Sequence, residues 1–168
     1  MSLISLLVKE LGKPKLHNID LKYIVLKTCL VHYKLLREHE GTLSNRVYML
    51  KKVLESAKLL KYPLLVDART FTILNGHHRF HALVSLGYEY IPIFPVDYAE
   101  DYVEVYSLRK EFKVSKIEVI KRSLSKRKYS PRTSKHILVG VNLPSSNIKL
   151  ESLKRGYFNT HCILDSII

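Results

Sequence analysis

The chain has 168 residues, 46% of them hydrophobic, and a formal net charge of +13. This length suits one domain with its own hydrophobic core, so we predict a single domain over residues 1–168. The positive charge predicts an anionic partner, such as a nucleotide, a nucleic acid or an acidic membrane. Because no apolar run approaches the roughly 18 to 20 residues of a membrane span, we expect no membrane insertion.

Two cysteines, Cys29 and Cys162, bear on the compartment. They form no Cys-x-x-Cys pair, so we expect free thiols in a reducing cytoplasm, with a disulfide between the two left open. Residues 1–11 lack a basic leader and a cleavage site, which argues against a signal peptide.

The first third of the chain predicts strands followed by one long helix. Residues 1–20 are expected to pack loosely. Lys22 to His32 is rich in β-branched and aromatic residues, which favours one or two strands. Ser44 is a suitable N-cap, and apolar residues at steps of three and four predict a helix from Asn45 to Leu60.

The middle of the chain alternates between short apolar runs and turns. These runs predict strands at Pro63–Val66, Phe71–Leu74 and Tyr90–Val96. Pro92 and Pro95 interrupt the last of them, which favours a sheet edge or bulges there. A helix is expected from Arg79 to Leu86, ended by Gly87.

The last third mixes strands, a capped helix and a basic loop. Strands are expected at Tyr102–Leu108 and Ile137–Val141, and a short helix or turn at Leu150–Leu153. Ser115-Lys116-Ile117-Glu118 is a capping box that predicts a helix to about Leu124. Together, the elements predict an α+β fold, a compact mixed sheet with flanking helices.

Three polar clusters are candidates for chemistry. The first is Asn75–Arg79, where a strand end meets a helix start; such a junction binds anions, although it can also be a plain turn with surface histidines. The second is Arg132–His136, which can wrap a phosphate or form a solvated basic loop. The third is Glu38-His39-Glu40, whose carboxylates can also simply face solvent.

Familiar nucleotide and metal motifs are absent from the sequence. It contains neither a GxxxxGK[ST] loop nor a GxGxxG turn. The spacing of His77, His78 and His81 matches neither HExxH nor a Cys/His finger, so structural zinc is not expected.

In their order along the chain, these residues resemble a known superfamily. The run Leu74–Leu83, followed by Leu86-Gly87, Ile91-Pro92 and Val96-Asp97-Tyr98, resembles the ParB/sulfiredoxin superfamily. Within it, the chain is most similar to the branch of free L-serine kinases, the archaeal ParB-like serine kinases, which reads Asp-Gly-His-His-Arg at the junction. That branch also has a His-Glu pair, as in His39-Glu40, and a Pro-Pro-Lys-Thr-Thr-Arg-His-like loop, similar to residues 130–136.

The resemblance implies an activity and a set of site residues. Those enzymes phosphorylate free L-serine to O-phospho-L-serine with ATP or ADP and Mg²⁺, which implies a cytoplasmic role in serine and cysteine biosynthesis. It implies catalytic roles for Glu40, Asn75 and His78. Nucleotide phosphates would be held by Gly76, His77, His78, Arg79, Thr133, Ser134 and Lys135. Serine would be held by Glu40, Arg132, Thr133 and His136, and Mg²⁺ mainly by the phosphates, with no certain protein ligand.

The chain departs from the branch in its length, which is shorter, and at two site positions. Asn75 replaces the usual Asp, which removes a carboxylate that can assist catalysis or hold metal. Lys135 stands where Arg is usual, which replaces a planar fork of donors by a point charge.

Other functions are weighed against the kinase. A ParB-like nucleotide- or DNA-binding protein without kinase activity suits the charge, yet no helix-turn-helix follows the junction, so nucleic acid is the less favoured partner. Sulfiredoxin-like reduction is rejected, because it needs a Cys where this chain has His77 or His78. The chain is expected to act as a monomer or a dimer.

Overall fold

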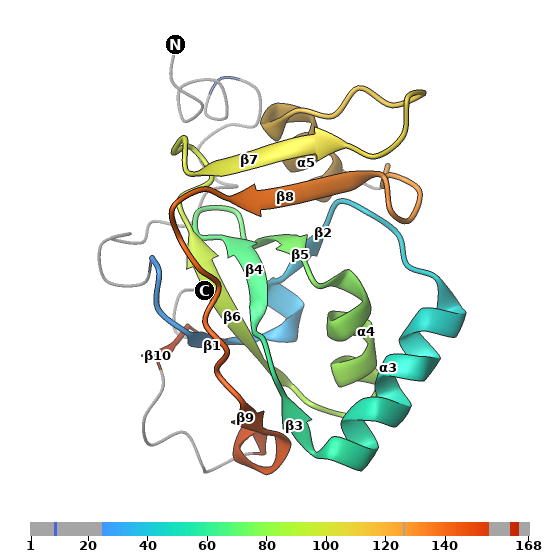
Figure 1. Ribbon diagram of the computed structural model, residues 1–168, viewed down its shortest axis with the longest axis vertical. Coiled ribbons are helices and arrows are strands. Elements are labelled where there is room, and N and C mark those ends of the chain that lie inside the picture. The colour runs from blue at the N-terminus through green and yellow to red at the C-terminus, as the bar shows by residue number, and fades with distance from the viewer. Residues whose placement is uncertain (1–8, 10–24, 126, 155–161, 165–168) are drawn as a thin grey trace.

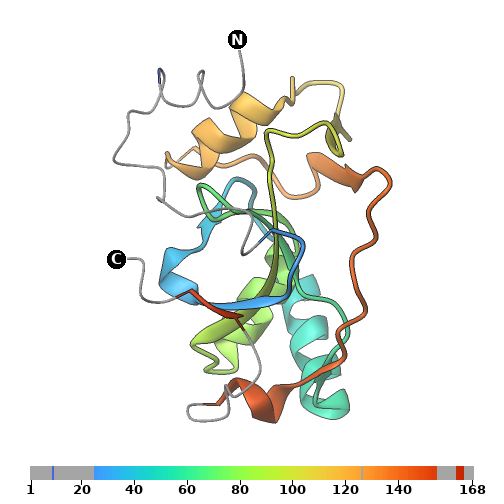
Figure 2. The same ribbon diagram turned by 90° about the vertical axis from the view of Figure 1, so that its left-hand side faces the viewer.

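A computed structural model describes residue 9 and residues 25–125, 127–154 and 162–164 of the chain (Figures 1 and 2). Within these residues it has an α+β fold, as the sequence predicted, with a curled mixed sheet and three α-helices. Residues 1–20, expected to pack loosely, lie outside the described residues apart from Lys9. None of the described helices has the length and apolar character that a membrane span requires.

The main sheet has six strands in the order β10-β1-β6-β4-β5-β2. Their bounds are β1 Cys29–His32, β2 Arg37–Glu38, β4 Leu64–Asp67, β5 Thr72–Asn75, β6 Tyr90–Val96 and β10 Cys162–Ile163. The pairs β1–β10, β6–β4 and β5–β2 are parallel, and the pairs β1–β6 and β4–β5 are antiparallel. Cys29 and Cys162, the two cysteines, are register partners on β1 and β10.

Two helices, α3 (Ser44–Ala57) and α4 (His77–Ser85), lie side by side against this sheet (Figure 1). Their apolar side chains join those of the strands in one buried cluster that includes Leu54, Ile73 and Leu83. The periodicity predicted α3, but its N-cap is Leu43 instead of Ser44, and no side chain caps it. The helix ends earlier than Leu60, because Lys58 adopts a left-handed conformation and the short strand β3 (Leu59–Leu60) follows.

A second layer packs on the far end of the sheet. It consists of a two-stranded antiparallel sheet, β7 (Val103–Ser107) and β8 (Ser134–Leu138), backed by α5 (Lys116–Ser123), as Figure 1 shows. The capping box is confirmed, because Ser115 Oγ accepts from the backbone N–H of Glu118. Strand β8 begins three residues earlier than Ile137, so Ser134–His136 of the predicted basic loop belong to the strand.

The prolines of β6 do not mark a sheet edge, so that prediction is wrong: β6 lies between β1 and β4. Pro92 pairs with β1, outside the part of β6 that β4 covers, and Pro95 pairs with β4, outside the part that β1 covers. Because Leu26 N–H donates to the Pro95 carbonyl, the polar groups of Pro95 face away from β4. The missing N–H groups therefore interrupt no ladder.

Three short elements complete the fold. The 3-10 helix η2 (Tyr33–Leu35) follows β1, and the strand β9 (Ile148–Lys149) pairs with β3 in a separate two-stranded sheet. The 3-10 helix η3 (Leu150–Leu153) confirms the predicted short helix near the C-terminus and contributes Leu150 and Leu153 to the main core.

Candidate active site

A cavity of about 440 Å³ opens where the ends of β2 and β5, the starts of α3 and α4, and the strand β8 meet. This is the place where the three polar clusters predicted from sequence come together. Its lining consists of Glu40, Arg46, Leu50, Leu74, Asn75, Gly76, His77, His78, Arg79, Leu108, Arg132, Ser134, Lys135 and His136. Four of these side chains are cations and one is a carboxylate, so the cavity suits an anionic ligand.

The strand–helix junction forms one wall. Strand β5 ends at Asn75, Gly76 is the N-cap with φ of 109°, and α4 starts at His77, two residues before the predicted start. Only glycine adopts this backbone conformation without strain. The first N–H groups of α4 and the positive end of its dipole therefore face the cavity, which is the arrangement that binds phosphate.

Arg79 adds a fixed positive charge to this wall. Its Nη1 donates to the carbonyls of Tyr62 and Pro63, at 2.9 and 3.0 Å, which ties α4 to the turn before β4. Burial lowers the pKa of Arg79, yet a guanidinium stays protonated in proteins. No carboxylate of the described residues pairs with it, so Nε and Nη2 remain as donors beside Gly76.

Glu40 forms the opposite wall through backbone contacts. Its Oε1 accepts from the N–H of Arg132 at 2.6 Å, and its Oε2 accepts from the N–H groups of Thr133 and Ser134 at 3.1 and 2.8 Å. The Ser134 hydroxyl lies 2.8 Å from the same Oε2. A parallel bridge between Glu40 and Tyr129 sets the two segments side by side. The carboxylate thus occupies a nest of backbone amides that can also hold a phosphate.

Three buried histidines lie behind and along this wall. The ring of His39 is 4.7 Å from that of His77 and 5.5 Å from that of His136. Burial lowers the pKa of His39 to about 4 and that of His136 to about 3, and it lowers the pKa of His77 well below the usual range. The Tyr98 hydroxyl lies 2.9 Å from His136 Nε2. All three imidazoles are therefore neutral at pH 7.

These histidines predict acid lability. Each is protonated more readily in the unfolded chain, near pH 6.5, than in the folded protein, so their stabilising contribution is lost as the pH falls from about 6.5 toward 4. We expect the free energy of unfolding to fall by about 1.4 kcal/mol per pH unit for each proton taken up. Chemical denaturation at pH 7, 6 and 5 measures this, and equal stabilities would contradict it.

Some predicted site residues have other partners. His78 lines the cavity, and its Nε2 accepts from the Leu43 N–H at 3.1 Å, which holds the start of α3. Thr133 is fully buried and does not line the cavity; its hydroxyl donates to the Ser130 carbonyl. The side chain of Asn75 is exposed at the cavity and has no hydrogen-bond partner among the described residues.

Asp97, the carboxylate that directly follows β6, does not line the cavity. It forms a bidentate ion pair with Arg69 and accepts from the Ala99 N–H. Ion pairing to a fixed guanidinium makes it a structural carboxylate, which leaves Glu40 as the carboxylate of the site.

Sequence reasoning missed Arg46, Leu50 and Leu108 as lining residues. No motif marks them, because the face of α3 that meets the cavity depends on how α3 packs on α4. His39 was visible beside Glu40 in the His-Glu pair, but its contacts across to β8 are a tertiary feature.

The cavity offers little of its own to a metal ion. No cluster of three or more His, Cys, Asp or Glu with ligand geometry occurs among the described residues. Glu40 is the lone carboxylate in the lining, and its oxygens already accept hydrogen bonds, so the protein residues do not form a Mg²⁺ site by themselves. That Mg²⁺ is held mainly by phosphates stays a prediction.

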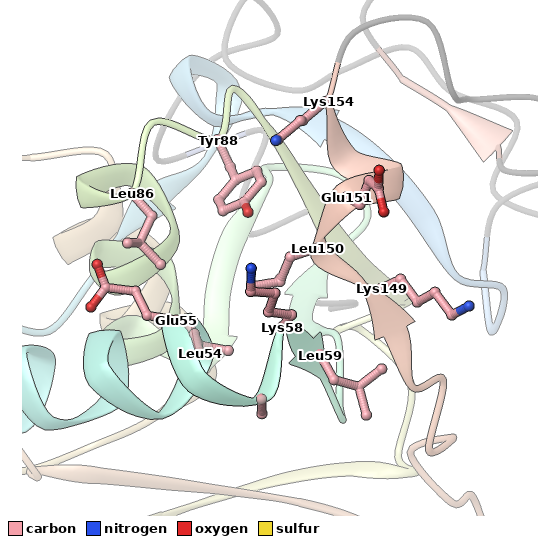
Figure 3. Close-up of a pocket in the computed structure, with 11 residues that line it drawn as sticks. Leu54, Glu55, Lys58, Leu59, Leu86, Tyr88, Lys149, Leu150, Glu151 and Lys154 are labelled. Atoms are coloured by element: carbon pink, nitrogen blue, oxygen red, sulfur yellow. The ribbon is translucent and has the colours of Figure 1, made fainter.

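Two further hollows lie on α3. One, of about 360 Å³, is lined by Asn45, Arg46, Met49, Leu50 and His78, and it shares three residues with the polar cavity. The other, of about 610 Å³, lies at the opposite end of the helix (Figure 3), where Lys58 and Tyr88 point into a leucine-lined hollow. It contains none of the predicted site residues, so size alone does not identify the active site.

Solved structures share this fold. A free serine kinase in complex with AMP superposes with a TM-score of 0.69 at 15% identity, covering 77% of this chain and 95% of that one. Two structures of one variant of a free serine kinase, in complex with AMP and with ADP, are similar. A conserved hypothetical protein from Pyrococcus furiosus superposes with a TM-score of 0.66 at 15% identity, covering 77% of this chain and 98% of that one. C-terminally truncated SbnI from Staphylococcus aureus superposes with a TM-score of 0.67 at 13% identity, covering 77% of this chain and 90% of that one.

Sequence similarity is more limited. No protein-family model matches the chain. A "ParB-like protein" of Sulfolobus acidocaldarius is 38% identical over 72 residues, which is 43% of this chain and 36% of that protein. The match thus spans about a third of that relative's length. The chain has the α+β fold of the free serine kinases, the ParB/sulfiredoxin-like fold that its motifs predicted.

Proposed function

We propose that the protein transfers a phosphoryl group from ATP or ADP to the hydroxyl of free L-serine. The observation that carries this proposal is the cavity whose lining combines one carboxylate, Glu40, with the N-terminus of α4 and four cationic side chains. Phosphoryl transfer needs mainly positioning and charge neutralisation, which such a cavity supplies. The fold shared with a free serine kinase in complex with AMP, and with a variant of it in complex with ADP, supports a nucleotide ligand.

The donor would bind along α3 and α4. Its phosphates would contact the N–H groups after Gly76, the free nitrogens of Arg79, and the side chains of Arg46 and Lys135. The base would lie in the adjoining hollow, against Met49 and Leu50. His77 supports a polar ligand here, because its Nε2 is buried without a partner among the described residues.

Serine would bind at the opposite wall. Arg132 suits its carboxylate, and Glu40 lies where the acceptor hydroxyl must be oriented and deprotonated. His136 would line this end, and Thr133 would contribute only its N–H, through Glu40. His78 and Asn75 would complete the site between serine and the phosphates, with Mg²⁺ bound to phosphate oxygens.

The decisive experiment is a coupled assay for O-phosphoserine, with ATP, ADP and pyrophosphate offered separately. We expect O-phosphoserine to form with at least one nucleotide when serine is present. Control reactions without serine should give no product. Replacing Arg132 with Gln is expected to raise the KM for serine more than that for nucleotide. Absence of product with every donor contradicts the kinase.

A second candidate is a nucleotide- or DNA-binding protein without kinase activity, which the net charge and the similarity to a ParB-like protein favour. Duplex binding would then fall steeply with salt, because phosphate contacts release counterions. Salt-sensitive duplex binding without serine-dependent turnover would reverse the order of the two candidates.

A further inference from the structure

A chain of three short contacts runs from the main sheet to the cavity. His39 Nδ1 lies 2.8 Å from the Ile73 carbonyl oxygen, and His39 Nε2 lies 2.8 Å from Ser134 Oγ. Ser134 Oγ in turn lies 2.8 Å from Glu40 Oε2. His39 is fully buried and Glu40 is only 7% exposed, so solvent has little access to the two partners of Ser134.

This row of three contacts has fewer hydrogens available than it has contacts. The carbonyl of Ile73 and an ionised Glu40 only accept, a neutral imidazole brings one hydrogen, and the Ser134 hydroxyl brings one. Three contacts of 2.8 Å need three hydrogens, so one contact places two lone pairs against each other. The row of contacts is therefore one proton short whichever way the Ser134 hydroxyl points.

The tautomer of His39 decides where the shortage lies. Burial lowers the pKa of His39 to about 4, so the ring is neutral near pH 7 and carries one hydrogen. Because the Ile73 carbonyl can only accept, we assign this hydrogen to Nδ1 and a lone pair to Nε2. Ser134 therefore has two acceptors, His39 and Glu40, for one hydroxyl hydrogen.

We propose that His39, Ser134 and Glu40 act as one proton-accepting unit, which takes up the proton released by the acceptor hydroxyl during phosphoryl transfer. This inference rests on the proposed function for the identity of the acceptor. In the step, the O–H bond of serine breaks and its oxygen bonds to the transferred phosphorus. The bond to the departing nucleotide phosphate breaks, and the proton enters the chain at Glu40.

The added proton completes the chain. With it on Glu40 Oε2, the carboxyl donates to Ser134, the Ser134 hydroxyl donates to His39 Nε2, and His39 Nδ1 donates to Ile73. All three contacts are then hydrogen bonds. The unit can thus accept the proton at Glu40, with His39 and Ser134 as positioning residues.

Other polar groups nearby are already engaged or do not reach the chain. The ring of His77 contacts His39 edge to face, and the ring of His136 has Tyr98 as its partner. Glu38, next to His39 in sequence, points to His81 and Lys128. No other donor among the described residues supplies the missing hydrogen.

Substitutions of Ser134 test the unit. Ser134→Ala is expected to lower kcat about 10- to 100-fold, the usual loss for a hydrogen bond to a charged group, with the KM for nucleotide little changed. Ser134→Thr keeps a hydroxyl and is expected to retain most of the turnover. Ser123→Ala is the matched control, because it removes a buried hydroxyl that is bonded to Thr72 and Ile120 and does not line the cavity. Equal losses in the Ala and Thr variants of Ser134, or none, would overturn the proposal.

A double-mutant cycle tests whether His39 acts through Ser134. His39→Leu alone is expected to lower kcat to a similar extent, and to have no further effect in the Ser134→Ala background. Losses that multiply in the double variant would overturn the proposal, because they would show independent roles.

A spectroscopic measurement separates this inference from the proposed function. In ¹⁵N-histidine-labelled protein without substrates at pH 7, we expect His39 to carry its proton on Nδ1, and its Nε2 resonance to shift in Ser134→Ala but not in Ser123→Ala. A proton on Nε2, or an unshifted resonance, would overturn the unit even in an active kinase. If the spectrum is as expected but the protein does not phosphorylate serine, the hydrogen-bonded unit stands and only the proposed substrate is refuted.

Discussion

Glu40→Gln is expected to lower serine phosphorylation by at least about 100-fold, because general-base assistance typically contributes about 100- to 10,000-fold and an amide cannot take up a proton. Nucleotide affinity should change little, since the removed charge acts on the acceptor hydroxyl. Turnover is measured with the coupled phosphoserine assay, and nucleotide binding by calorimetry on the same preparation.

The contacts of Glu40 add a stability effect to this variant. The carboxylate accepts from three backbone N–H groups, at Arg132, Thr133 and Ser134. A glutamine turns an NH₂ group toward one of these donors, which should reduce the free energy of unfolding by about 1–3 kcal/mol. Thermal unfolding is therefore measured with and without nucleotide alongside the assay. It shows whether the variant is folded at the assay temperature, so that a loss of turnover is not caused by unfolding.

Asn75→Asp is the matched comparison at the other wall. It restores the residue usual in the free serine kinases and should keep or raise turnover, while the folded protein is otherwise unchanged because Asn75 is exposed. A Glu40→Gln enzyme with turnover near that of the wild type would show that Glu40 is not the base. Asp97 would not replace it, because Arg69 already binds that carboxylate.

Gly76→Ala is expected to weaken nucleotide binding by at least about tenfold and to destabilise the fold by about 1–3 kcal/mol. An added Cβ would lie 2.9 Å from Leu64 Cγ and 3.0 Å from Arg79 Nη2, and the φ of 109° is unfavourable for alanine. The guanidinium would have to move away from the start of α4, where the phosphates are proposed to bind. Calorimetric titration with ADP and ATP measures the loss.

Gly87→Ala separates crowding from backbone strain. Gly87 also has a positive φ, of 85°, but a Cβ there would meet nothing within 4 Å. It should therefore reduce stability without changing nucleotide affinity. Equal affinities in the two alanine variants would remove the Gly76 turn from the binding site.

The sequence predicted the features that are encoded locally. A glycine between an apolar run and a helical pattern identified the junction at Gly76, and the capping box identified the start of α5 at Ser115. The bounds of β6 also followed from its apolar residues. These features depend on neighbours within a few residues, so a local pattern suffices to find them.

The features that the sequence did not predict depend on residues distant along the chain. Pro92 and Pro95 are tolerated in an inner strand because β1 and β4 cover different halves of β6. Ser44 does not cap α3, whose first turn is held by His78 from another helix. Thr133 was assigned to a ligand, yet the Ser130 carbonyl takes its hydroxyl. No local pattern contains this information.

The way Glu40 is held has a consequence for how the loop can diverge. Glu40 contacts the main chain at residues 132 and 133, so the side chains at these positions do not set its location. Replacements there can alter ligand preference while the carboxylate stays in place. Proline is the exception, because it alone has no N–H to donate. The side chains at positions 132 and 133 can therefore vary while the loop still folds around the Glu40 carboxylate.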